Sequence, residues 1–236
     1  MSLADKLIKL IEYMKKQMIG FPDFLTPQQL EASGVEDAWS AKDNLFHSLY
    51  WSNNQLENIE RFERGEGEKA DNDFEIVNKE IFHVYKDRTW QDARSMADKT
   101  YQGILDYLEG INEDRLVSTR EGREQPIWRD IVGSYITHPM IHLWEQLIDA
   151  GRVDKIAEIF GDKYHNMLLE LDDSDNYRGG LFYNQACLLA LSGELDEAVQ
   201  VLGKALKMTP ALIDWSKEDS DLDALRELSE YQALYE

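Results

Sequence analysis

The sequence lacks several features that mark specialised folds and compartments. Its single cysteine, Cys187, leaves no partner for an internal disulfide. The opening stretch MSLADKLIKLIEYMKK contains no uninterrupted apolar run of the kind found in a signal peptide or a membrane span. We therefore expect a protein of the reducing cytoplasm, with no membrane partner.

Basic residues are also scarce, with 25 lysines and arginines against 46 aspartates and glutamates and a net charge of -21. Such a surface repels phosphate backbones and anionic membranes, so nucleic acid is not expected as a partner. The sequence contains no glycine-rich phosphate loop, no serine nucleophile elbow and no cysteine-rich zinc pattern. Nucleotide chemistry therefore has no support in the sequence.

Helical periodicity, by contrast, runs through almost the whole chain, and alternating strand-like stretches are nearly absent. The spacing predicts a first helix from Leu3 that stops near Gly20, followed by a small helical turn over residues 27–32. Ser40 and Asp43 predict the cap of a long second helix that ends at the polar stretch RGEGEKADND. The pattern is typical of an all-α fold.

Two further long helices complete the first part of the chain. A third helical region is predicted to begin around Asp73 and to pause near residues 86–88. It restarts at a cap formed by Thr89 and Asp92 and ends at Gly110. Pro126 is expected to open a fourth long helix that closes at Gly151. Four long helices joined by loops predict an up-and-down four-helix bundle.

The chain is expected to divide near residue 172. One additional amphipathic helix is predicted from Arg152 to about Asp172, and the polar stretch DDSDNYRGG then indicates a boundary. We therefore expect a bundle with an extra helix over residues 1–172 and a separate helical extension over residues 173–236.

The extension carries the spacing of a tetratricopeptide repeat (TPR) between residues 182 and 210. The positions that match this spacing are Phe182, Ala186, Leu189, Gly193, Ala198, Leu202, Ala205 and Pro210. The tail repeats leucine and tyrosine at helical spacing and predicts a capping helix or a degenerate partial repeat. The TPR-like hairpin is expected to pack on the bundle, and it is a candidate site for a protein partner.

Histidines provide the candidate site. His138 and His142 are four residues apart in HPMIH and so lie on one helical face, and His47 lies in WSAKDNLFHSL on the second predicted helix. Three imidazoles from two helices would form a metal site with open coordination positions. The alternative is that the pair is solvated or packed in the core and that His47 makes a hydrogen bond at the edge of the core.

Neighbouring residues allow two interpretations each. Pro139 is expected to kink the fourth helix and to free the carbonyl of Tyr135, either as a packing feature or to aim the imidazoles. Asp43 is either a helix-start charge or a hydrogen-bond acceptor for His47. Tryptophans and tyrosines on the same two helices are core residues, some of which could line an apolar pocket beside a metal. We assign His83, His165 and Cys187 to no site.

The segments WSAKDNLFHSLYW and IVGSYITHPMIHLWEQL, in this order, resemble the DinB-like superfamily of four-helix bundles, including its DinB/YfiT and ClbS/DfsB-type and thiol-transferase members. The resemblance covers about residues 1–150, and Trp39 matches the helix-start pattern of the family. It implies that His47, His138 and His142 bind a divalent metal ion, usually nickel, zinc or iron. Pro139 and the TPR-like tail are departures from the family pattern.

These observations favour a metal-dependent enzyme in which the three histidines activate a thiol or water. The resemblance implies a thiol S-transferase or a hydrolase of detoxification or stress type, with a small-molecule substrate that includes a low-molecular-weight thiol in the first case. The alternative is a non-catalytic interaction module that acts through the TPR-like region. A third interpretation is that the bundle pairs with itself as a homodimer.

Overall fold

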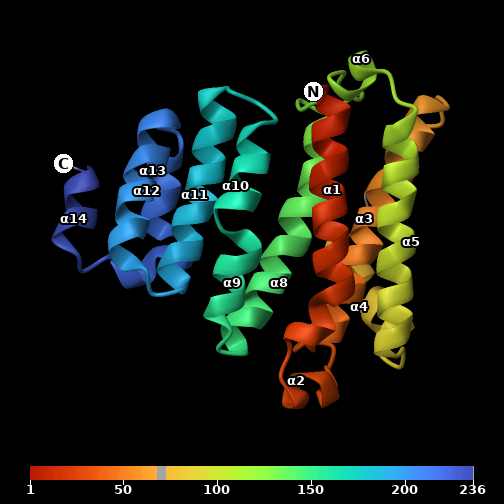
Figure 1. The fold of residues 1–236 in the computed structure, drawn as a ribbon, viewed down its shortest axis with the longest axis horizontal. Helices are drawn as coiled ribbons and strands as arrows, with labels where there is room; N and C mark the ends of the chain where they lie inside the picture. The colour runs from red at the N-terminus through yellow and green to blue at the C-terminus, as the bar shows by residue number, and fades with distance from the viewer. Residues whose placement is uncertain (68–72, 236) are drawn as a thin grey trace. The chain divides into compact units, whose positions relative to one another are not determined.

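The computed structural model describes residues 1–67 and 73–235, and their regular secondary structure is helical (Figure 1). This confirms the all-α fold class. Residues 68–72, which belong to the polar stretch RGEGEKADND, lie outside the described residues. The chain forms two compact units, Met1–Ile159 and Phe160–Glu236, and each is described by itself.

The first unit contains most of the long helices. Its elements are α1 (Leu3–Gly20), η1 (Phe21–Phe24), α2 (Pro27–Glu31), α3 (Ala41–Glu63), α4 (Phe74–Tyr85), α5 (Trp90–Glu109), α6 (Glu113–Leu116), α7 (Ile127–Val132), η2 (Gly133–Thr137), α8 (His138–Asp149) and α9 (Val153–Phe160), whose last residue belongs to the second unit. The long helices α1, α3 and α5 start where the sequence predicted. The loop before Pro126 differs from the prediction, because it contains the short helix α6.

Capping boxes determine where the long helices begin. Asp43 accepts hydrogen bonds from the backbone nitrogen of Ser40 at 2.9 Å and from its hydroxyl at 2.6 Å. Asp92 does the same for Thr89, at 2.9 and 2.8 Å. Both predicted caps are confirmed, because each pair satisfies backbone N–H groups that have no partner inside the helix.

The apolar faces of these helices pack around one core. Helix α1 packs on α5, α3 packs on α5 and α8, and η2 contacts α1 and α3 (Figure 1). The core includes buried side chains from α1, α3, α5, α7, η2 and α8, namely Leu7, Ile11, Met14, Leu45, Leu49, Ile59, Tyr101, Ile104, Ile131, Tyr135, Leu143 and Leu147. Burial of each large side chain contributes about 1.5–3 kcal/mol, so this packing holds α3 and α8 against each other.

The single helix predicted from Arg152 to about Asp172 is wrong. The structure has two helices here, α9 and α10 (Asp162–Leu169), separated by Gly161 in an extended conformation with ψ -158°. Gly161 ends the regular hydrogen bonding because an extended residue cannot continue a helical turn. Periodicity alone missed this break, since the apolar spacing continues across it.

The second unit is built on a helical hairpin. Its elements after α10 are α11 (Asp175–Leu191), α12 (Leu195–Met208), α13 (Leu212–Glu218), η3 (Ser220–Leu225), α14 (Ser229–Gln232) and η4 (Ala233–Tyr235). Gly193 makes the turn between α11 and α12 with φ +85°, which favours glycine. At Gly179 a Cβ atom would lie 2.0 Å from the Thr209 hydroxyl, so the close approach requires a glycine.

The tail, predicted as a capping helix or a degenerate partial repeat, is not one continuous helix. Leu222, Leu225 and Tyr231 are buried in the core of the hairpin with Ala186 and Ala198. The tail reaches these positions through short helical and 3-10 segments, because α13 ends before Asp219 takes an extended conformation. The apolar side chains of the tail are therefore buried in the hairpin core, although the tail is divided into short segments.

The boundary at residue 172 stays a prediction. In the structure α10 contacts α11, and the second compact unit accordingly begins at Phe160. Among the described residues, no helix combines the length and apolar character that a membrane span requires.

Candidate metal centre

His47 lies in the second turn of α3, and the N-terminal cap of that helix is tightly packed. Gly34 approaches the cap so closely that a Cβ atom there would lie 2.1 Å from Oδ2 of Asp43. Asp43 itself is buried and bonds Ser40, so its contacts support the helix-start interpretation. The His47 side chain is only 7% exposed. The cap and the loop before it thus fix the first histidine.

His138 and His142 come from α8, which begins directly after a π-helical turn, η2. The backbone N–H of His138 donates to the carbonyl of Gly133, five residues earlier. Pro139 follows in the first turn of α8, where a missing N–H costs little. The expected disturbance at Pro139 therefore takes the form of a π-turn, a feature that is frequent at functional sites.

The π-turn leaves carbonyls that other helices satisfy. The Tyr101 hydroxyl donates to the carbonyl of Tyr135 at 2.8 Å, which is the carbonyl that Pro139 was expected to free. The Ser52 hydroxyl donates to the carbonyl of Ser134 at 2.7 Å. Because α3 and α5 both bond this turn, they fix the start of α8 and with it the position of His138.

The three imidazoles converge on one point. Nε2 of His138 lies 3.1 Å from Nε2 of His47 and 3.1 Å from Nε2 of His142. One ligand nitrogen from each of the three lies within 4.8 Å of the others. Metal–nitrogen bonds of about 2.0–2.1 Å place neighbouring nitrogens roughly 2.9–3.4 Å apart, depending on the coordination geometry. The group can therefore hold a metal ion.

The environment keeps His47 and His138 neutral. Burial, together with repulsion from the other two histidines, lowers the pKa of His47 to about 3, against a smaller opposing effect of the Asn78 side chain. Burial and His142 lower the pKa of His138 to about 4. A metal ligand must carry a free lone pair, so neutral imidazoles favour binding of a cation at neutral pH.

Aromatic side chains cover His47. The ring of Trp39 lies 4.9 Å from its ring, and the ring of Trp51 lies 6.4 Å away. The Trp39 indole donates to the carbonyl of Glu36, and the Trp51 indole donates to Asn78. Two of the aromatic residues that sequence reasoning associated with the histidines thus lie beside the centre.

No family model matches this chain, and neither does any curated protein or solved structure. The resemblance to the DinB-like superfamily accordingly stays a prediction. The metal centre is supported by its own geometry, which joins residues 91 positions apart in the sequence.

The other histidines and the cysteine lie elsewhere. His83 is exposed and bonds Glu36 at 2.8 Å. His165 belongs to the second unit, where burial lowers its pKa. Cys187 is buried in the hairpin core, and burial raises the pKa of its thiol. It lies near Asp219 and Asp221, but the Asp219 carboxylate already accepts hydrogen bonds from neighbouring side chains.

Sequence reasoning missed Glu145. Its Oε2 lies 3.2 Å from Nδ1 of His142, the ring nitrogen that does not face His138. The spacing of three residues on one helix was a signal that could have identified it. Among the many acidic residues of this chain, however, that spacing alone did not distinguish Glu145.

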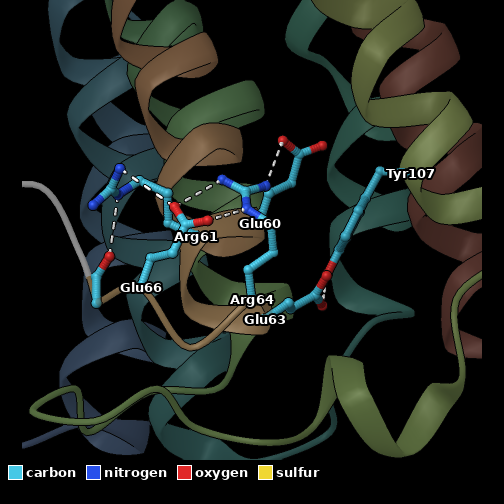
Figure 2. A network of polar contacts seen from close by, with 7 residues as sticks. Glu60, Arg61, Glu63, Arg64, Glu66 and Tyr107 are labelled. Atoms are coloured by element: carbon cyan, nitrogen blue, oxygen red, sulfur yellow. Dashed lines mark hydrogen bonds and ion pairs between the residues drawn. The ribbon is translucent and has the colours of Figure 1, made fainter.

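A second polar cluster lies at the other end of α3. Figure 2 shows its residues, which are acidic and basic side chains together with one tyrosine: Glu60, Arg61, Glu63, Arg64, Glu66 and Tyr107. Glu63 accepts hydrogen bonds from the Tyr107 hydroxyl at 2.8 Å and from Arg115 at 3.2 Å, beside a cavity of ≈ 680 Å³. These contacts pair the charges with each other, so the cluster has the character of a structural network.

Proposed function

We propose that this protein is a metal-dependent enzyme in which His47, His138 and His142 hold one divalent cation, namely nickel, zinc or iron. The observation that carries the proposal is the convergence of three Nε2 atoms, with separations of 3.1 Å from the central His138. One hydrogen bond between imidazoles uses one N–H and one lone pair, whereas a shared cation would engage the lone pairs of all three Nε2 atoms at once.

We also propose that the first unit is an up-and-down four-helix bundle of the DinB-like type. The packing of α1, α3, α5 and α8 supports this topology, as does the position of the histidines on α3 and α8. The hairpin of α11 and α12 would then be a TPR-like unit added to the bundle. Its buried alanines support close packing of the two helices.

The proposed chemistry is activation of a thiol or water for thiol transfer or hydrolysis of a small molecule, in detoxification or a stress response. A divalent cation supplies a nucleophile at neutral pH because it lowers the pKa of a coordinated thiol or water. The three histidines leave coordination positions open for that ligand. The rings of Trp39 and Trp51 would give this ligand an apolar surface beside His47.

Elemental analysis of protein purified without a histidine tag tests the metal site. We expect about one divalent ion per wild-type chain and none for His138→Ala, because removal of the central ligand leaves a two-nitrogen site. Glu63→Gln, a control at the far end of α3, should keep its metal. A His138→Ala variant that folds, by circular dichroism, and retains its full metal content would reject the proposal.

A second candidate function is protein interaction through the TPR-like region. Leu191 and Trp215 in the second unit are 43% and 61% exposed, so these apolar side chains are accessible to a partner protein. Trp215→Ala should then abolish association with a partner protein while the metal content stays unchanged. Light scattering of the wild-type chain would separately decide whether the protein is a homodimer.

A further inference from the structure

Glu145 is the one acidic side chain found in contact with the candidate ligands in the described part of the chain. It lies three residues after His142 on α8, and its Oε2 is 3.2 Å from Nδ1 of that histidine. An ionised carboxylate only accepts hydrogen bonds, so Nδ1 must be the donor. The proton of a neutral His142 ring then lies on Nδ1, and Nε2 carries the lone pair that faces His138.

His47 has a different kind of neighbour. Its Nδ1 is buried, and the side chain that acts on this ring by hydrogen bonding is the neutral amide of Asn78, not a carboxylate. His142 is therefore the ligand whose tautomer is set by a charged group. The side chain of Glu145 is 57% exposed and that of His142 is 22% exposed, so the carboxylate acts from the solvent side of the centre.

We propose that Glu145 is a positioning residue of the metal centre, which orients the His142 ring and holds its proton on Nδ1 so that Nε2 is available to a cation. The inference rests on the proposed metal site and adds a residue to it. Partners of this kind raise the basicity of a ligating imidazole, and their loss typically weakens metal binding by about 10–100-fold. Because Glu145 is half exposed, we expect an effect near the lower end of this range.

Zinc affinity provides the first test. Titration of the metal-free full-length protein against a chromophoric zinc chelator should show about tenfold weaker binding for Glu145→Ala than for wild type. Glu145→Gln should recover part of the loss, because its amide oxygen can accept the same hydrogen bond without the charge. Asp149→Asn removes an exposed carboxylate one turn further along α8 and should bind zinc as wild type does.

Nitrogen NMR of the metal-free protein provides the second test, which a merely structural role would not affect. The His142 signals should report the proton on Nδ1 in wild type and Asp149→Asn, and a mixture of tautomers in Glu145→Ala. If wild type binds zinc but Glu145→Ala binds it equally well, or if the wild-type proton lies on Nε2, the inference is wrong and the proposed function stands. If wild type binds none of zinc, nickel and iron(II) in the same titration, the proposed function fails and the inference fails with it.

Discussion

The two ends of α3 carry polar clusters of opposite kinds. Near its N-terminus, His47 faces His138 and His142, three side chains that are all electron-pair donors to a cation. Near its C-terminus, Arg64 makes two contacts with Glu66, at 2.7 and 3.2 Å, and charges of opposite sign satisfy one another (Figure 2). A cluster that pairs opposite charges has a structural explanation, whereas a cluster of three imidazoles can hold a cation.

Burial sharpens this difference. His47 is 7% exposed, and its pKa is lowered to about 3, so its ring is neutral at neutral pH and keeps a lone pair. The side chains of Arg64 and Glu66 are 51% and 43% exposed, and solvent screens their interaction. The histidine end can therefore bind a cation without first losing a proton, whereas the charges at the other end already neutralise one another.

The largest expected effect is metal-dependent stability at the histidine end. Zinc at about a thousand times its dissociation constant should raise the wild-type free energy of unfolding by about 4 kcal/mol, because it binds the folded state preferentially. His47→Ala should lose most of this gain and Glu63→Gln should keep it, as measured by urea unfolding with and without a chelator. Equal stabilisation of both variants would remove the distinction between the two ends.

The next effect is a pH dependence of stability in the metal-free protein. An unfolded imidazole has a pKa of about 6.5, whereas His47 and His138 have pKa values of about 3 and about 4 in the fold. The unfolded chain therefore binds protons first, and the free energy of unfolding should fall as the pH decreases from 7 through 6.5 towards 4.

Urea unfolding at pH 7 and pH 5, in the presence of a chelator, measures this dependence. A variant with His47→Leu and His138→Leu should lose less stability over this range than wild type, because it lacks both buried imidazoles. His83→Asn, which changes an exposed histidine, should follow wild type. If the double variant and wild type lose the same stability, the two histidines are not responsible.

A smaller effect is expected from the hydrogen bond that supports the π-turn. Tyr101→Phe leaves the buried carbonyl of Tyr135 without its 2.8 Å donor and should lower the free energy of unfolding by about 1–3 kcal/mol. Tyr107→Phe, at the other end of the unit, removes a hydroxyl that bonds the half-exposed Glu63 and should cost less. Thermal or urea unfolding of the two variants compares them, and a larger loss for Tyr107→Phe would contradict this assignment.

The smallest effect is expected at the exposed ion pairs. Arg64→Ala should lower the free energy of unfolding by about 0.2–1 kcal/mol, because solvent weakens the pair with Glu66. The loss should shrink further in high salt. Zinc affinity should not change, and a clear decrease in zinc affinity would mean that the two ends of α3 are coupled.

Local signals predicted much of the fold. The caps at Ser40 and Thr89 were recognisable because a capping box is a contact between residues three apart. The turn at Gly193 was recognisable for the same reason, since it depends on a single residue with φ +85°. The break at Gly161 was not, because the apolar spacing continues on both sides of it.

The candidate site was predictable only in part. The spacing of His138 and His142 placed both on one face, because the helical repeat determines which residues are neighbours. Sequence could name His47 as a third member but could not place it 3.1 Å from His138. It also gave no indication that the disturbance at Pro139 would take the form of a π-turn with its carbonyls bonded by Ser52 and Tyr101.

The sequence by itself determined where the long helices α1, α3 and α5 begin and which of their residues share a face, because these properties depend on contacts within one or two turns. Only the tertiary structure decided which faces meet. The packing of α3 against α8 brings His47 to the histidine pair, and the pairing of Glu145 with His142 is selected from many acidic residues. Both contacts depend on how side chains far apart in the sequence pack together, and a local sequence pattern does not contain this information.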